Sequence, residues 1–199
     1  MVSTPGSTPE STAGENPEPA TPPARDGRAA RAARPACVAV FVLTAAVVLG
    51  ADAGSKQWAD HRLAGGDPIS LLGGAVKLVY TTNAGAAFSI GTGFTVVLSV
   101  VAAGVVAVLL RIAGRLRSTA WALALGLVLG GALGNLVDRI FRAPATFRGQ
   151  VVDWIQLPHW PVFNLADSGI VCGVVLILLL ELRGVRVDGG RHVQESAGD

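Results

Sequence analysis

The sequence has few of the residues from which metal centres and disulfide frameworks are built. Its 199 residues include two cysteines and three histidines. Cys37 and Cys172 both lie in apolar segments, where we expect small buried side chains that form no disulfide. The histidines, at positions 61, 159 and 192, show no zinc-ligand spacing. The sequence therefore gives no support to a metal-dependent mechanism, and we expect no metal and no cofactor.

Charged residues are also scarce. They make up 15% of the chain against 51% hydrophobic residues, and the mean hydropathy is +0.51. The formal net charge of +2 is too small and too scattered for a nucleic-acid-binding surface, so we expect no nucleic-acid partner. This composition is atypical of a soluble domain and indicates an integral membrane protein.

Residues 1–35 differ from the rest in composition. Ser, Thr, Pro, Gly, Ala and Glu dominate, and aromatic residues are absent. Such a segment buries too little apolar surface to offset the entropy of ordering it. We predict a disordered cytoplasmic tail over 1–35, a membrane domain over 36–182 and a cytoplasmic C-terminal tail over 183–199.

Four apolar stretches of membrane-spanning length follow the tail. They cover roughly residues 36–57, 88–111, 119–140 and 163–182. A helix needs about 20 residues to cross the hydrocarbon core. The predicted fold class is therefore an all-α membrane protein with four transmembrane helices.

Basic residues predict the orientation of these helices. Arginines gather before the first span, between the second and third, and after the fourth, which places both termini in the cytoplasm. An alternative interpretation is a cleaved signal peptide, because basic residues precede the apolar run 37–50 and the small-residue triplet 51–53. That alternative would discard Asp52 and Lys56.

The two loops on the extracytoplasmic side contain short strand-like runs. Residues 75–82 and 149–157 are rich in β-branched and aromatic residues and are bounded by Gly, Pro and Asn. We predict a small sheet resting on the outer membrane surface. Aromatic side chains suit that interface, and the candidates are Tyr80, Phe147, Trp154 and Trp160.

Acidic side chains interrupt the apolar pattern at the outer ends of the third and fourth spans. Asp138 and Asp167 each follow an asparagine by three residues, Asn135 and Asn164, which places amide and acid on one helix face. A non-functional alternative is that both acids are ordinary residues of the lipid–water interface, and the helix dipole would favour Asp167 near the start of its helix. Ionisable groups in spans are nevertheless costly and usually mark a functional site.

Two neighbouring carboxyl groups provide an acid and a base together, because one retains its proton while the other is ionised. The ionised group can activate water for attack on a peptide carbonyl, and the protonated group can stabilise the oxyanion and assist the departing amine. A pair formed by Asp138 and Asp167 would therefore suit peptide hydrolysis without a metal or a covalent intermediate.

Further polar residues fall on the same side of the membrane. Asp52 and Lys56 are four residues apart and can pair on one helix face, and Asn83 precedes a small-residue stretch. We interpret Asp153, in a predicted strand, as a solvated residue. Glycines on the third span indicate helix packing, and they are at positions 126, 130, 131 and 134.

Five blocks give the chain a family resemblance. They are "ADAGSKQW", "TTNAGAAFSI", "GGALGNLVDRI", "VVDWI" and "FNLADS", spread over residues 36–182. Their order and spacing resemble those of the lipoprotein signal peptidases (signal peptidase II), the bacterial intramembrane aspartic proteases. The long N-terminal tail and the polar C-terminal tail lie outside the family pattern.

The resemblance implies a four-helix fold with an extracytoplasmic β-cradle in the bacterial inner membrane. It implies cleavage of prolipoproteins just before the diacylglyceryl-modified cysteine, contact with membrane lipids and sensitivity to the cyclic peptide globomycin. Asp138 and Asp167 would be the dyad, and we expect a monomer. Six residues would support the site: Asp52, Lys56, Asn83, Asn135, Arg139 and Asn164.

Two other function classes remain open from the sequence. A small proton-coupled transporter also needs intramembrane acids, but its relay usually extends through the depth of the membrane. A scaffold that binds a partner in the membrane would tolerate replacement of either aspartate by asparagine. The gathering of the acids on one side favours the peptidase.

Overall fold

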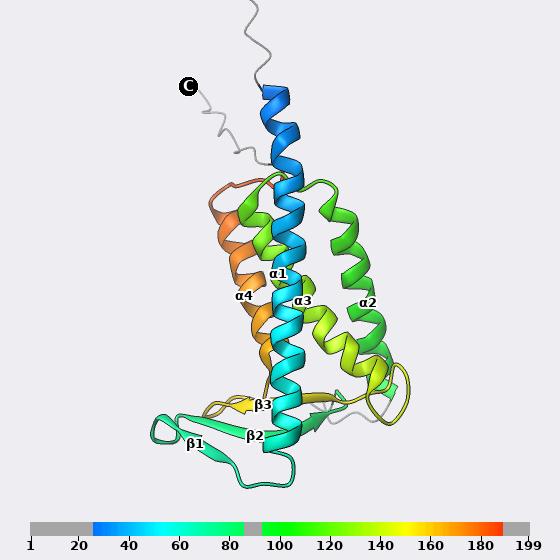
Figure 1. Ribbon diagram of the computed structural model, residues 1–199, viewed down its shortest axis with the longest axis vertical. Helices are drawn as coiled ribbons and strands as arrows, with labels where there is room; N and C mark the ends of the chain where they lie inside the picture. Colours follow the sequence, from blue (N-terminus) through cyan, green and yellow to red (C-terminus); the bar gives the residue numbers. More distant parts are fainter. Residues whose placement is uncertain (1–25, 86–92, 189–199) are drawn as a thin grey trace, which may run out of the picture.

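The computed structural model describes residues 26–85 and 93–188 (Figure 1). Its helices run side by side, and a small sheet lies across one end of the bundle (Figure 1). The elements in chain order are α1 (Asp26–Arg62), β1 (Ile69–Leu71), η1 (Leu72–Gly74), β2 (Val76–Asn83), α2 (Gly93–Ala113), α3 (Thr119–Phe141), β3 (Val151–Gln156) and α4 (Leu165–Leu182).

All four helices are long and apolar enough to cross a membrane, which confirms the predicted fold class. Large apolar side chains cover their outer surfaces, as expected where helices meet lipid, among them Leu43, Val100, Val101, Val171 and Leu178. The predicted second span began at residue 88, and residues 86–92 lie outside the described part of the chain. Both described chain ends and the loop between α2 and α3 lie at the end opposite the sheet (Figure 1).

The boundaries of the predicted tails differ from the structure. Helix α1 begins at Asp26, well inside the segment 1–35 that we predicted to be disordered. The reason is local, because residues 26–34 consist mainly of alanine and arginine, which favour helix, and the helix continues through Pro35. Residues 1–25 lie outside the described part of the chain.

The first residues of the predicted C-terminal tail fold back on the bundle. The Trp121 indole N–H donates to the Val185 carbonyl over 2.8 Å, and the Arg117 N–H donates to the Val187 carbonyl over 3.1 Å. Val185 and Val187 pack against the apolar core at this end. Their apolar side chains therefore explain why residues 184–188 belong to the folded domain.

Helix α3 is the centre of the bundle and contacts α1, α2 and α4. Its glycines let the neighbouring backbones approach closely. A Cβ atom on Gly130 would lie 2.6 Å from the Val48 Cβ of α1, and one on Gly134 would lie 3.1 Å from the Ala166 Cβ of α4. The prediction that the glycines of this span serve helix packing is confirmed.

The sheet has the antiparallel order β1-β2-β3. The two predicted strands are present as β2 and β3, whereas the three-residue β1 is too short to be evident from the sequence. Trp160 is 63% exposed, as expected for an interface residue. Trp154 instead packs edge-on against Trp58 of α1, with ring centroids 5.6 Å apart, and so joins the sheet to the bundle.

Both cysteines are free, as predicted. Cys37 is buried, with its sulfur 4.0 Å from the Thr119 hydroxyl oxygen. Cys172 is exposed on α4, so the prediction that it is buried is wrong. The reason is that α4 presents much of its apolar surface outward, where lipid replaces protein as the apolar surroundings. Within residues 26–85 and 93–188, no group of His, Cys, Asp and Glu has the arrangement of a metal site.

Candidate functional site

Buried polar side chains gather at the sheet end of the bundle, where α1, α3 and α4 meet β3. The structure brings the predicted site residues together there, and hydrogen bonds or ion pairs connect all of them except Arg139. Helix α1 supplies Asp52 and Lys56, α3 supplies Asn135, Asp138 and Arg139, the start of α4 supplies Asn164 and Asp167, and β2 ends at Asn83.

Lys56 is buried between two carboxylates. Its ammonium lies 2.6 Å from Asp52 and 2.7 Å from Asp138, and both Lys56 and Asp52 have side chains that are 1% exposed. The other oxygen of Asp52 accepts the Ala166 backbone N–H over 2.9 Å. A buried charge is tolerated only when it is paired and hydrogen-bonded. This cluster therefore fastens α1 to α3 and to the first turn of α4.

Asp138 contacts two cations. Besides Lys56, the Arg142 Nε donates to Asp138 Oδ1 over 2.6 Å. The Val152 backbone N–H lies 3.4 Å from Asp138 Oδ2. These contacts attach the end of α3 to Lys56 of α1 and to Val152 of β3.

Asn135 connects Lys56 to Asp167. Its Oδ1 accepts from Lys56 Nζ and from Asn164 Nδ2, each over 3.2 Å, and its Nδ2 donates to Asp167 Oδ1 over 2.7 Å. The two donors on the oxygen fix the orientation of the amide, since a flipped amide would place its NH₂ group against both. The orientation that remains directs a donor at Asp167.

Asp167 also belongs to the N-terminal cap of α4. The Asn164 side-chain oxygen accepts the Asp167 N–H over 2.9 Å, and Asp167 Oδ2 accepts the Asn164 N–H over 3.3 Å. The spacing in "FNLAD" is thus that of a capping box. The cap holds the Asp167 carboxylate in place at the N-terminus of α4, where the residue is half-buried.

Asp153 is buried, with 3% of its surface exposed, so its interpretation as a solvated strand residue is wrong. Strand β3 is covered by α1 and α3, and all of its first three residues are buried. Asn164 Nδ2 donates to Asp153 Oδ1 over 2.6 Å, and Asn83 Nδ2 donates to Asp153 Oδ2 over 3.2 Å. Burial, followed by the nearby Asp167 carboxylate, raises the pKa of Asp153 to about 6.

Asp153 and Asp167 are therefore the more closely coupled pair of acids. One residue, Asn164, hydrogen-bonds to both of them, through its side chain and its backbone N–H. The connection from Asp138 to Asp167 runs instead through both Lys56 and Asn135. The proposed pairing of Asp138 with Asp167 stays a prediction, and the hydrogen bonds favour Asp153 as the partner.

Arg139 faces this acidic pair. Its charge interacts with Asp167, Asp153 and Asp138, and its guanidinium is partly buried. Among the described residues, its Nη1 is a buried nitrogen for which no hydrogen-bond acceptor is in place. A cation held there can neutralise negative charge that develops next to the acids.

Three contributors to the network, Asp60, Tyr80 and Arg142, were not predicted as site residues from the sequence. Arg142 Nη1 lies 3.0 Å from Asp60 Oδ2, and the Tyr80 hydroxyl donates to Asp60 Oδ1 over 2.8 Å. The helical spacing was the available signal, because Asp52, Lys56 and Asp60 follow at intervals of four, as do Asp138 and Arg142. Only the fold shows that the two series face each other.

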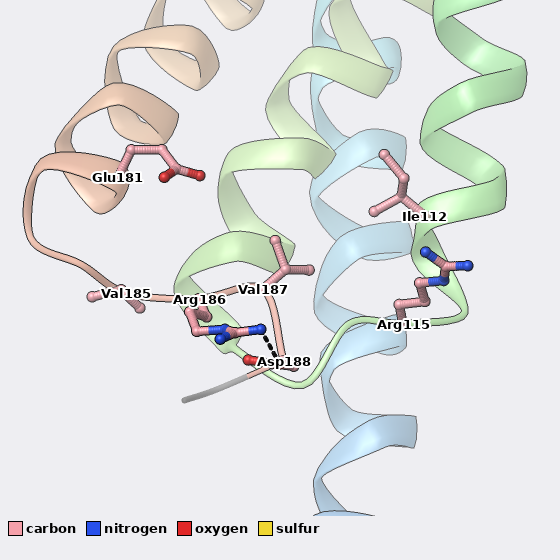
Figure 2. A pocket seen from close by; sticks show the side chains of 7 residues that line it. All are labelled: Ile112, Arg115, Glu181, Val185, Arg186, Val187 and Asp188. Atoms are coloured by element: carbon pink, nitrogen blue, oxygen red, sulfur yellow. Dashed lines mark ion pairs between the residues drawn. The ribbon is translucent and has the colours of Figure 1, made fainter. Parts of the chain in front are cut away.

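The opposite end of the bundle has a different character. A cavity of about 510 Å³ lies there, and Figure 2 shows Glu181, Arg186 and Asp188 around it with Ile112 and Val187. Arg186 and Asp188 form an ion pair of 3.3 Å, but both side chains are more than half exposed. The buried and coupled acids are therefore confined to the sheet end within the described residues.

Several known proteins are similar to this chain. It is 50% identical over 155 residues to a lipoprotein signal peptidase of Streptomyces coelicolor, covering 78% of this chain and 76% of the relative. It is 53% identical over 152 residues to one of Rhodococcus jostii, covering 76% of each. The Mycobacterium tuberculosis lipoprotein signal peptidase is 45% identical over 162 residues, with 80% of each chain covered.

The fold has solved counterparts as well. A bacterial membrane enzyme determined at 1.9 Å superimposes with a TM-score of 0.64 at 26% identity, covering 72% of this chain and 92% of its own. The model of the signal peptidase (SPase) II family matches residues 44–183. That match runs from the first span through the fourth and contains every residue of the acidic network, so the chain belongs to the signal peptidase II family.

Proposed function

We propose that this protein is a lipoprotein signal peptidase that works as an aspartic endopeptidase, with Asp153 and Asp167 as its catalytic dyad. The observation that carries the proposal is the Asn164 bridge, because one side chain and its own backbone hold both carboxyl groups. The substrate class follows from the curated relatives, which are lipoprotein signal peptidases.

The surroundings of the two acids suggest their roles. Because the pKa of Asp153 is raised to about 6, this group holds a proton in mildly acidic conditions and serves as the acid. Asp167 accepts hydrogen bonds from the Asn135 side chain and from the Asn164 backbone N–H, which hold its carboxyl group in place, and we assign it the role of the base.

The reaction then needs no covalent intermediate. Asp167 takes a proton from water, and the water oxygen bonds to the scissile carbonyl carbon. Asp153 stabilises the developing oxyanion by donating its hydrogen bond, and Arg139 offers the positive charge next to it. Collapse of the tetrahedral intermediate breaks the C–N bond, and the proton held by Asp167 passes to the departing amine.

The substrate fits the position of this site. A prolipoprotein carries a diacylglyceryl group on a cysteine, and the proposed cleavage is directly before that cysteine. The acids lie where apolar helices meet the sheet, the depth at which a lipid-anchored peptide can present its peptide bond to water. The exposed apolar surfaces of α2 and α4 are available to membrane lipids and acyl chains.

The proposed location is the bacterial inner membrane, with both termini in the cytoplasm and the site near the extracytoplasmic face. Arginines support this orientation, since those of the α2–α3 loop and of the segment after α4 lie at the end opposite the sheet. We propose a monomer that needs no cofactor and is inhibited by globomycin. The buried acids of the described residues, Asp52, Asp138 and Asp153, all lie at the sheet end of the bundle, which favours a hydrolase over a proton relay.

Cleavage of a diacylglyceryl-modified prolipoprotein by the purified protein in detergent tests the proposal. Asp153→Asn and Asp167→Asn should each fold and lose activity by about 10²–10⁴-fold, the usual contribution of acid–base groups. A chelator should leave the wild type unchanged. Asp188→Asn, in the exposed ion pair at the opposite end, is the matched control and should cleave normally.

Asp138→Asn separates the two candidate dyads. Under the proposal it should mainly reduce stability, because it leaves Lys56 and Arg142 without their shared partner. If folded Asp138→Asn is inactive while Asp153→Asn cleaves at the wild-type rate, the dyad is Asp138 and Asp167 instead.

A further inference from the structure

Asp138 is a branch point from which contacts run to both acids of the proposed dyad. On one branch, Asp138 Oδ2 lies 3.4 Å from the backbone N–H of Val152, the residue directly before Asp153. On the other, it lies 2.7 Å from Lys56 Nζ, which leads through Asn135 to Asp167. The Asp138 carboxylate is thus connected to Asp153 through Val152, and to Asp167 through Lys56 and Asn135.

Arg142 holds Asp138 at this branch point from the outside. Its Nε donates to Asp138 Oδ1 over 2.6 Å, while its Nη1 lies 3.0 Å and 3.3 Å from the two oxygens of Asp60. The guanidinium therefore joins the end of α3 to the end of α1. Its planar arrangement of donors can make both contacts at once, which a lysine ammonium on a flexible stem does less well.

We call the connection from Asp138 through Arg142 to Asp60 the brace, and its Asp60 end is held in turn by β2. The Tyr80 hydroxyl, on β2, donates to Asp60 Oδ1 over 2.8 Å. Burial raises the pKa of Tyr80, and the hydrogen bond to Asp60 raises it further, so the hydroxyl keeps its proton. At the near side, the Arg142 backbone N–H donates to the Asp138 carbonyl over 2.9 Å. Three elements, α1, α3 and β2, thus fix one guanidinium.

We propose that Arg142 is a positioning residue for peptide hydrolysis. It acts through Asp138 to hold the carboxyl groups of Asp153 and Asp167 in place relative to each other. This inference rests on the proposed function. Arg142 contacts the two acids only through intermediates, so its loss should misplace them without removing either. Because small misplacements of reacting groups are costly, the chemical step should slow while substrate binding is largely retained.

The test compares Arg142→Gln with Arg142→Lys in the full-length protein, using cleavage of a diacylglyceryl-modified prolipoprotein. Arg142→Gln should lower kcat by about 10- to 100-fold with KM changed less than about twofold. Arg142→Lys should recover part of kcat, since it keeps the charge but not both contacts. Arg148→Gln, an exposed arginine in the same loop, is the matched control and should keep the wild-type kcat.

A double-mutant cycle shows whether Arg142 acts through its brace. Asp60→Asn combined with Arg142→Gln should cost less than the product of the two single effects, because both changes break one connection. Tyr80→Phe removes only the outer hydrogen bond and should lower kcat by a smaller factor, about two- to fivefold. It provides the test if Arg142→Gln does not fold.

The outcomes separate this inference from the proposed function. Wild-type kcat in folded Arg142→Gln, or in Tyr80→Phe where Arg142→Gln does not fold, would overturn the positioning role and leave the dyad intact. A rise in KM at unchanged kcat would also overturn it, because Arg142 would then contact substrate. Cleavage by Asp167→Asn at the wild-type rate would instead remove the proposed function and the inference with it.

Discussion

At the sheet end of the bundle, buried charges hold the helices together, whereas at the opposite end the same helices meet through apolar side chains. Lys56, Asp52 and Asp138 are nearly inaccessible at the first end. Phe41, Trp121 and Leu125 fill the core at the second, where the ion pair between Arg186 and Asp188 lies on the surface. Buried charges without compensating contacts would be costly, so their concentration at one end marks the end where chemistry is expected.

The difference also concerns what each contact specifies. Apolar packing sets how closely two helices approach but tolerates many side chains of similar volume. A hydrogen-bonded charge network specifies the orientation of each group, as Asn135 illustrates with one acceptor and one donor directed at different partners. The predictions below test this contrast, from the largest expected effect to the smallest.

Lys56→Met should have the largest effect on stability. It removes the only cation placed between Asp52 and Asp138 in the described structure and leaves two buried carboxylates facing each other, which should cost about 3–5 kcal/mol. Thermal unfolding in detergent measures this loss. Arg186→Met is the control at the opposite end. Equal unfolding temperatures for the two variants would show that the buried network contributes no more than an exposed pair.

Phe41→Ala should destabilise the opposite end without altering the chemistry. Phe41 is 1% exposed, and its truncation leaves a cavity in the apolar core. We expect the free energy of unfolding to fall by about 2 kcal/mol. The cavity removes packing contacts, but the apolar side chain is surrounded by lipid in the unfolded state, so little is lost from transfer out of water. At a temperature where the variant is folded, kcat should equal that of the wild type. A lowered kcat under those conditions would mean that the two ends are coupled.

The pH dependence of cleavage should report on Asp153. Its pKa is raised to about 6, so the group is protonated below that pH and ionised above it. If Asp153 is the acid, kcat/KM should fall about tenfold per pH unit on the alkaline side. Asn83→Ser removes a donor to the ionised form and should shift this decline to higher pH. If the alkaline decline of kcat/KM is not shifted in Asn83→Ser, the titration of a group other than Asp153 causes it.

Arg186→Gln should have the smallest effect. The ion pair that it breaks is more than half exposed on both sides, and exposed pairs contribute little. The free energy of unfolding should change by less than about 0.5 kcal/mol, and cleavage should be unchanged. A loss comparable with that of Lys56→Met would contradict the distinction between the two ends.

Much of the fold follows from local composition. Spans of about 20 apolar residues predicted all four helices, and the glycines of α3 predicted its close packing. The helical start of α1 and the fold-back of Val185 and Val187 were missed. In the first case, a segment rich in small and charged residues has good helix propensity. In the second, two valines are too few to stand out until the core that they cover is known.

The sequence predicted which polar residues come together better than it predicted their partners. Asn135, Asn164, Asp138 and Asp167 stood out because polar residues are rare in such apolar surroundings. Asp153 was predicted to face solvent because alternate residues of a strand often do. That pattern fails here because the first three residues of β3 are all buried, next to α1 and α3. Whether an acid faces water or another acid depends on what covers it.

The sequence by itself determined how many helices cross the membrane and at which end the polar residues gather, because hydropathy and charge act along the chain. Only the tertiary structure decided which acid faces which partner. Asp138 lies between two cations, and Asp153 shares Asn164 with Asp167. Electrostatic interactions depend on distances between residues that are remote in sequence, and the packing of α1, α3, α4 and β3 sets those distances.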